Sequence, residues 1–107
     1  MDPRFSLGRV DGAVVLRISG DLDIAVEDDA VAAVADALAT DPPPSYLVLD
    51  LSDVAFMDSS GLRALLRIHN RHGSQIRLGP VSNVVERLLE LTGTVELFAP
   101  GQGSQEA

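Results

Sequence analysis

Two adjacent serines, with aspartates nearby, are the side chains of this sequence that could carry chemistry. Ser59 and Ser60 follow Asp58 directly, and Asp21 and Asp23 stand at the end of an earlier apolar segment. A serine hydroxyl in such surroundings can act as a nucleophile, accept a phosphate, or cap a helix. The rest of the sequence must therefore distinguish these three roles.

A catalytic nucleophile is the first role, and it needs a base within hydrogen-bond reach. The sequence contains two histidines, His69 and His72, which follow Ser59 by ten and thirteen positions. Along one helix such separations amount to about 15 to 20 Å. The Gly-x-Ser-x-Gly turn of serine hydrolases is also absent. We therefore expect no enzyme activity, and we expect His69, which falls on an apolar helical stripe, to be partly buried.

Metal and nucleotide sites are not indicated either. Asp50, Asp53 and Asp58 are close in sequence, but they lack the dense oxygen ligands and closing glutamate of a calcium loop. The absence of cysteine excludes thiolate metal sites and disulfides. Neither a Walker-type loop nor a Gly-x-Gly-x-x-Gly loop occurs. We expect no cofactor and no bound metal.

The elements around the serines are a strand and a helix. Residues 46–51 are rich in aliphatic side chains, as is typical of a parallel strand that is covered on both faces. Apolar residues then recur at helical spacing, which predicts a helix over about residues 60–72. A hydroxyl at this junction lies where open α/β folds hold ligands and tolerate phosphate. Three residues can cap the helix, and capping alone is a complete alternative role for the serines: Asp58, Ser59 and Ser60.

The remaining elements are expected to alternate along the chain. Asp11-Gly12 between two strand-like segments predicts a hairpin, Asp23 can cap the first helix, and Gly79-Pro80 is expected to end a strand. Alternating strands and helices imply parallel pairing with right-handed crossovers. The prediction is an α/β domain with an N-terminal hairpin and a mixed, mainly parallel sheet. The expected strands are 5–10, 13–19, 46–51, 75–78 and 95–98, and the expected helices are 26–39, 60–72 and 82–92.

Length and hydropathy indicate one domain. The chain has 107 residues, enough for one packed core, and we expect that domain to cover residues 1–99, followed by a disordered tail over 100–107. No apolar run approaches the roughly 20 residues that cross a bilayer. The N-terminus lacks the apolar segment of a signal peptide. We expect a cytoplasmic protein without membrane contact.

The charge pattern argues against nucleic acid as a partner. The formal net charge is −8, whereas binding to a phosphate backbone uses clustered basic residues. Arg63, Arg67 and Arg71 form a stripe that we interpret as a solvated helix face. A surface of one sign attracts a complementary partner, so we expect a partner with a basic patch. The acidic side chains concentrate at Asp21, Asp23, Glu27, Asp28 and Asp29.

Three segments resemble the STAS domain, and specifically the bacterial anti-sigma factor antagonists. The segment FMDSSGL at residues 56–62 resembles the signature of the family. The segment ISGDLD at residues 18–23 resembles the family's connection between the second strand and the first helix. The segment VVERLLELTG at residues 84–93 resembles its third helix. Order and spacing agree from about residue 5 to residue 98, nearly the whole chain.

The resemblance implies a phosphorylation switch. In this family the first serine of the Asp-Ser-Ser-Gly run is phosphorylated by a partner kinase that is itself the anti-sigma factor, which assigns this role to Ser59. The unmodified form is expected to bind the anti-sigma factor with serine kinase activity and so free a sigma factor. Phosphorylation would end that binding, and a protein phosphatase would restore it. The implied partner-binding residues are Asp21, Asp23, Asp58, Ser59 and Ser60.

Two departures from the family pattern leave alternatives open. Family members commonly continue from the last strand into a C-terminal helix, whereas this chain passes through Ala99-Pro100-Gly101. Either that helix is dispensable or one sheet face is open to self-association, for instance as a homodimer. Ile24-Ala25-Val26 replaces the threonine that many relatives carry near the helix start. A STAS domain can also be a non-phosphorylated scaffold in a signalling or lipid-transport complex, and this function stays open as the alternative.

Overall fold

Four strands form one mixed sheet in the computed structural model, which describes residues 4–98. The strands lie in chain order across the sheet, as β1 (Phe5–Val10), β2 (Ala13–Leu22), β3 (Tyr46–Met57) and β4 (Ile76–Val81). β1 pairs antiparallel with β2, and the other neighbouring pairs are parallel. The predicted α/β fold, with its N-terminal hairpin and mainly parallel sheet, is therefore confirmed.

The hairpin depends on the Asp11-Gly12 turn. Asp11 has φ 45° and Gly12 has φ 86°. Positive φ at both central residues is the requirement of a type I′ turn, whose twist matches that of the two strands. β1 and β2 consequently pair without offset, from Val10 opposite Ala13 to Phe5 opposite Ile18.

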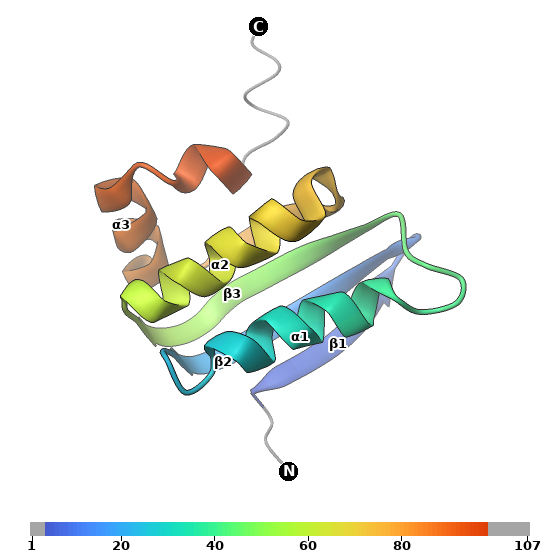
Figure 1. The fold of residues 1–107 in the computed structure, drawn as a ribbon, viewed down its shortest axis with the longest axis horizontal. Coiled ribbons are helices and arrows are strands. Elements are labelled where there is room, and N and C mark those ends of the chain that lie inside the picture. The colour runs from blue at the N-terminus through green and yellow to red at the C-terminus, as the bar shows by residue number, and fades with distance from the viewer. Residues whose placement is uncertain (1–3, 99–107) are drawn as a thin grey trace, which may run out of the picture.

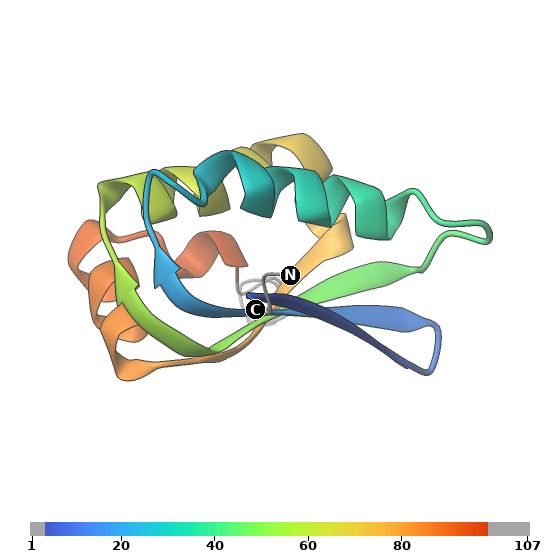
Figure 2. The ribbon, with the colours of Figure 1, turned by 90° about the horizontal axis from the view of Figure 1, so that it is seen from below.

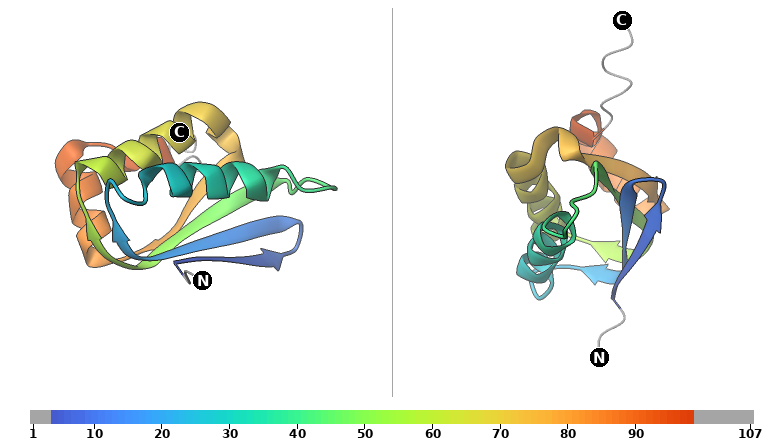
Figure 3. Two further views of the ribbon diagram at one scale, coloured as in Figure 1. Left: turned by 60° about the horizontal axis from the view of Figure 1, so that its bottom comes forward. Right: turned by 90° about the vertical axis from the view of Figure 1, so that its right-hand side faces the viewer.

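Helices cover one face of this sheet. α1 (Glu27–Leu38) and α2 (Ser59–His72) lie side by side on the same face, as Figure 2 and Figure 3 show. α3 (Asn83–Thr92) lies beyond α2 in Figure 1, and it ends at Gly93, whose φ of 70° is left-handed. A short 3₁₀ turn, η1 (Gly73–Gln75), joins α2 to β4, and a second, η2 (Val95–Phe98), follows α3.

The core lies between the sheet and these helices. Leu16 of β2, Leu49 of β3 and Leu65 of α2 are at most 1% exposed, and each such side chain contributes about 1.5 to 3 kcal/mol on burial. α3 adds Val85 and Leu89 to the same cluster. This packing fixes the helix axes relative to the strands, and thereby the positions of the loops that join them.

β2 and β3 are longer than the sequence pattern predicted. They end at Leu22 and Met57 instead of Ser19 and Leu51, because parallel pairing continues through two register irregularities as far as Leu22 beside Met57. The polar residues that follow Leu51 do not end the strand, since they are exposed while Val54 and Met57 are buried. The extension carries both strands to the edge where the serines lie.

Two predictions for the C-terminal third are wrong. Gly79-Pro80 lies inside β4, and Gly79 packs so closely that an added Cβ would lie 2.7 Å from Val48 Cγ1. β4 is an edge strand, where a proline without an N–H group is tolerated. Residues 95–98 form the 3₁₀ turn η2 instead of a strand. The expected tail at residues 100–107 lies outside the described residues.

The opposite face of the sheet carries paired polar side chains. Asp50 is buried there, and its Oδ2 accepts hydrogen bonds from Nε and Nη2 of Arg17 at 3.2 Å each. Burial raises the pKa of Asp50, but hydrogen bonds from Ser52 and then Arg17 outweigh it, so that the pKa is lowered. Arg77 stacks on the ring of Tyr46 at 3.9 Å from the centroid. Asp50 is therefore a paired structural residue.

Candidate functional site

The predicted site residues meet at one edge of the sheet. β2 and β3 are parallel, so their carboxyl ends lie together, with Asp21 beside Phe56 and Leu22 beside Met57. The chain leaves both strands at this point, into the loop before α1 and the turn before α2, at the left of Figure 1. Asp23 directly follows the end of β2 and Asp58 directly follows the end of β3, so both aspartates lie at the same edge.

Asp58 is the cap of α2. Its Oδ1 accepts hydrogen bonds from the N–H of Ser60 at 2.9 Å and from the N–H of Gly61 at 3.2 Å. Its backbone is extended, as expected at an N-cap. Of the three candidates that the sequence offered, Asp58 satisfies these amides, so neither serine is needed for that purpose.

The two serines have different surroundings. Ser59 is the first residue of α2 and is exposed to solvent. Ser60 is 8% exposed, and its Oγ accepts a hydrogen bond from Nη2 of Arg63 at 3.5 Å. The hydroxyl of Ser59 is accessible to a partner, whereas that of Ser60 belongs to the start of the helix.

Gly61 lets α2 approach the sheet closely enough to place Ser59 at this edge. A Cβ on Gly61 would overlap the carbonyl oxygen of Leu22 and would lie 2.7 Å from Cγ of Met57. The helix start therefore touches the last residues of both β2 and β3. The glycine of the motif has a steric reason that holds independently of any role in binding.

Asp21 is exposed at the end of β2, and Asp23 is half-buried just after it. Asp23 was a possible cap of α1, but the N-cap is Val26 and no side chain bonds to the first amides. Oδ1 of Asp23 instead accepts the N–H of Ala25 at 3.1 Å, and its carbonyl accepts the N–H of Val26 at 3.0 Å. Asp23 therefore shapes the loop before α1.

The interpretation of the arginine stripe on α2 as a solvated face is wrong for Arg63 and Arg67, which form ion pairs with α1. Glu27 of α1 binds Nε of Arg63 and Nη1 of Arg67, each at 2.9 Å, and Asp28 binds the same Nη1 at 2.9 Å. The hydrogen bond from Arg63 lowers the pKa of Glu27, burial opposes that change, and Arg67 lowers it further. Part of the predicted acidic cluster is thus neutralised within the protein, where it links α1 to α2.

Two large apolar side chains are exposed at the same edge. Ile24, in the loop before α1, is 72% exposed, and Phe56, beside Asp21, is 46% exposed. The sequence placed both residues in family-like segments, but neither was predicted to be a contact residue. Strand alternation gives no clear signal for Phe56, because Val54, two positions earlier, and Met57, the next residue, are both buried. The edge therefore presents apolar surface together with carboxylates and one hydroxyl.

Among the described residues, both histidines lie far along α2 from Ser59. His69 and His72 lie in the last turn of α2, at the opposite end of the helix, and His69 is partly buried as expected. Within residues 4–98, no group of three His, Asp or Glu side chains could hold a metal ion. In the same range, no helix is both long and apolar enough to span a membrane.

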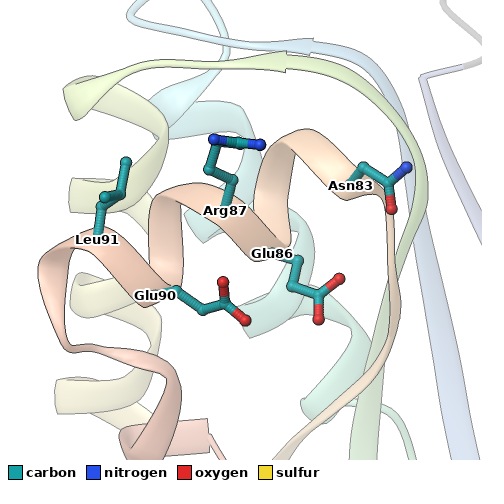
Figure 4. Close-up of a pocket in the computed structure, with 5 residues that line it drawn as sticks. All are labelled: Asn83, Glu86, Arg87, Glu90 and Leu91. Atoms are coloured by element: carbon teal, nitrogen blue, oxygen red, sulfur yellow. The ribbon is translucent and has the colours of Figure 1, made fainter.

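A hollow on the surface of α3 is lined by none of these residues. Figure 4 shows its lining side chains, all of which come from that one helix. Ligand pockets draw convergent polar groups from several elements. The hollow therefore does not compete with the edge around Ser59 as the candidate site. Its lining residues are Asn83, Glu86, Arg87, Glu90 and Leu91.

Comparison with known proteins gives a consistent result. The family model of the STAS domain matches residues 4–107. The anti-sigma F factor antagonist of Paenibacillus polymyxa is 32% identical over 90 residues, which cover 81% of this chain and 76% of that protein. The anti-sigma-F factor antagonist RsfB of Mycobacterium tuberculosis is 32% identical over 89 residues, which cover 81% of this chain and 71% of that protein.

A solved structure agrees with the family model and with the two sequence relatives. The crystal structure of an anti-sigma factor antagonist from Mycobacterium paratuberculosis superposes with a TM-score of 0.69 at 30% identity, covering 88% of this chain and 80% of that one. The fold, the extent of the match and the sequence relatives all agree with the resemblance first seen in the Asp-Ser-Ser-Gly segment. The chain therefore belongs to the STAS domain family.

Proposed function

We propose that this protein is an anti-sigma factor antagonist controlled by phosphorylation of Ser59. The observation that carries the proposal is the exposed hydroxyl of Ser59 at the edge where β2 and β3 end, in a chain whose relatives bear that name. Unmodified, the protein binds an anti-sigma factor that has serine kinase activity, and a sigma factor is released. Phosphorylated, it dissociates.

Phosphorylation requires no catalytic groups from this protein, because the kinase supplies them. The kinase transfers the γ-phosphoryl group of ATP to Oγ of Ser59, so that the new O–P bond replaces the bond to the leaving ADP, and the hydroxyl proton passes to a base of the kinase. A protein phosphatase reverses the change by hydrolysis and releases inorganic phosphate. The only requirement on this protein is an accessible serine on a rigid element, and Ser59 on α2 meets it.

The proposed contact surface combines apolar anchors with charge. Ile24 and Phe56 provide exposed apolar area of the kind that dominates interface energetics, and Asp21, Asp23 and Asp58 favour a basic partner. Ser60 is too buried to add a side-chain contact. A phosphate on Ser59 would stand within this surface.

The free energies involved indicate how phosphorylation would end binding. Taking a complex from 99% to 1% bound requires about 5.5 kcal/mol of differential affinity. Repulsion between two unit charges at about 4 Å is worth about 1 kcal/mol in water and about 4 kcal/mol near a protein surface. Repulsion alone falls short, so steric exclusion and the loss of a hydroxyl hydrogen bond must contribute. Ser59→Asp, with one smaller charge, should therefore mimic the phosphate incompletely.

The test is affinity capture from the source cell with wild type, Ser59→Ala and Ser59→Asp as baits, followed by binding measurements with the purified partner. We expect wild type and Ser59→Ala to capture an ATP-binding kinase. Ser59→Asp should bind that kinase at least about tenfold more weakly than wild type does, which is equivalent to about 1.4 kcal/mol. Mass spectrometry should find the phosphate on Ser59 after incubation with that kinase and ATP.

Ser74→Asp is the matched control, because it adds the same charge at an exposed serine beyond the other end of α2. It should bind as wild type does. Equal binding by all the variants and by the phosphoprotein would reject the switch and favour a constitutive scaffold.

A further inference from the structure

Arg63 is placed to reach a group on Ser59. It follows Ser59 by four positions on α2, and residues at this spacing are neighbours on a helix surface. Helical side chains lean toward the N-terminus of their helix. The guanidinium does so here, because Nη2 lies 3.5 Å from Oγ of Ser60. The side chain of Arg63 is 55% exposed, so its cation is open to the surface beside Ser59.

Three backbone donors of the first turn of α2, of the kind that can receive an anion at a helix N-terminus, are already bonded. Oδ1 of Asp58 accepts the N–H groups of Ser60 and Gly61, and the carbonyl of Asp58 accepts the N–H of Leu62 at 3.0 Å. A phosphate on Ser59, with about −1.5 to −2 charges, would also stand beside the Asp58 carboxylate. The phosphate therefore needs a cationic side chain more than it needs the helix terminus.

Arg63 can leave its present partner at limited cost. It binds Glu27 through Nε at 2.9 Å and Nη2 at 3.1 Å, while Arg67 holds the same carboxylate at 2.9 Å. The Glu27 side chain is only 10% exposed, and a buried carboxylate left without a cation would be strongly destabilising. Because two arginines share Glu27, Arg67 can keep it paired when Arg63 moves.

We propose that Arg63 is the phosphate-binding side chain of the phosphorylated protein, an inference that rests on the proposed phosphorylation of Ser59. On phosphorylation the guanidinium exchanges the Glu27 carboxylate for the phosphate oxygens, and Arg67 retains Glu27. The exchange fixes the orientation of the phosphate over the first turn of α2. It also leaves Arg67 to make the ion pairs with Glu27 and Asp28 that join α1 to α2.

The experiment uses protein in which phosphoserine is inserted at position 59 during synthesis, so that no kinase is required. Phosphorus NMR titrations give the second pKa of the phosphate in wild type, Arg63→Gln and Arg71→Gln. Arg71→Gln removes the same charge from the last turn of α2, far from Ser59. The neighbouring groups Asp21, Asp23, Asp58, Glu27 and Asp28 are common to all three proteins.

We expect the phosphate pKa to be higher in Arg63→Gln than in wild type by about half a unit or more, because a contacting cation favours the dianion. Arg71→Gln should match wild type. A crystal structure of the wild-type phosphoprotein should place the Arg63 guanidinium about 2.8 Å from a phosphate oxygen. The wild-type structure does not depend on any variant folding normally.

Two results would overturn the inference: equal phosphate pKa values in wild type and Arg63→Gln, or Arg63 still bound to Glu27 through both nitrogens in the phosphoprotein. The proposed function fails separately, if the same phosphoprotein binds the anti-sigma factor as tightly as the unmodified protein does. Contact between Arg63 and the phosphate would then stand without the switch.

Discussion

At the scale of single residues, the start of α2 separates a structural role from a proposed regulatory one. Asp58 satisfies two amides of the first turn, while Ser59 faces solvent. Asp58→Ala should therefore lower the free energy of unfolding by about 1 kcal/mol, as loss of an N-cap usually does. Ser59→Ala should change it by less than about 0.5 kcal/mol, as is usual for an exposed position. Urea unfolding followed by circular dichroism measures both.

A Ser59→Ala variant that loses as much stability as Asp58→Ala would contradict this assignment, because the serine would then be the cap. The distinction also affects binding experiments. If Ser59→Ala folds as wild type does, any change in partner binding reports on the hydroxyl itself.

At the scale of elements, the Glu27 cluster joins α1 to α2 and makes their packing sensitive to acid. Arg63 lowers the pKa of Glu27, against the opposing effect of burial, and Arg67 lowers it further. Since the folded pKa lies below the unfolded value of about 4.3, this contribution to stability is complete above the unfolded pKa. It is lost as the pH falls through the folded pKa.

Glu27→Gln should therefore lose less stability than wild type between about pH 5 and pH 3. Urea unfolding at several pH values measures the difference. Asp50, whose pKa is also lowered, contributes equally in both proteins, so the comparison isolates Glu27. Glu90→Gln, at an exposed position of α3, is the control and should follow the wild-type pH profile. If Glu27→Gln also follows that profile, the cluster does not stabilise the folded protein.

At the scale of the whole molecule, the approach of the helix layer to the sheet decides where Ser59 lies. Gly61 sits where a Cβ would overlap the Leu22 carbonyl and crowd Met57. Replacing a helical glycine with alanine normally stabilises a helix by about 0.5 to 1 kcal/mol. Here we expect Gly61→Ala to destabilise the protein by about 1 to 3 kcal/mol, because the layers must separate.

Gly8→Ala is the matched control, because a Cβ on Gly8 meets no heavy atom within 4 Å. Its effect on the free energy of unfolding should stay within about 0.5 kcal/mol. Both variants can be compared by urea unfolding under the same conditions. A Gly61→Ala protein as stable as wild type would show that the α2 start does not depend on this close approach.

The sequence by itself determined the features that are encoded locally. The Asp11-Gly12 turn, the helices that end near Gly73 and Gly93, and the strand-serine-helix junction at Ser59 all follow from turn chemistry and periodicity. These signals lie within a few residues of the feature that they specify. The residues of the Asp-Ser-Ser-Gly segment, which are also a local feature, indicated the STAS family. The comparisons confirmed that the chain belongs to this family.

Only the tertiary structure decided the features that depend on distant parts of the chain. β2 and β3 extend to Leu22 and Met57 because each supplies the other's hydrogen-bond partners, and Gly79-Pro80 remains in β4 because an edge strand tolerates it. Glu27 looked like part of an exposed acidic cluster, yet two arginines from the next helix pair with it. The physical reason is common to all of these residues: strand register, burial and ion pairing are set by partners 29 or more positions away, and no local pattern records them.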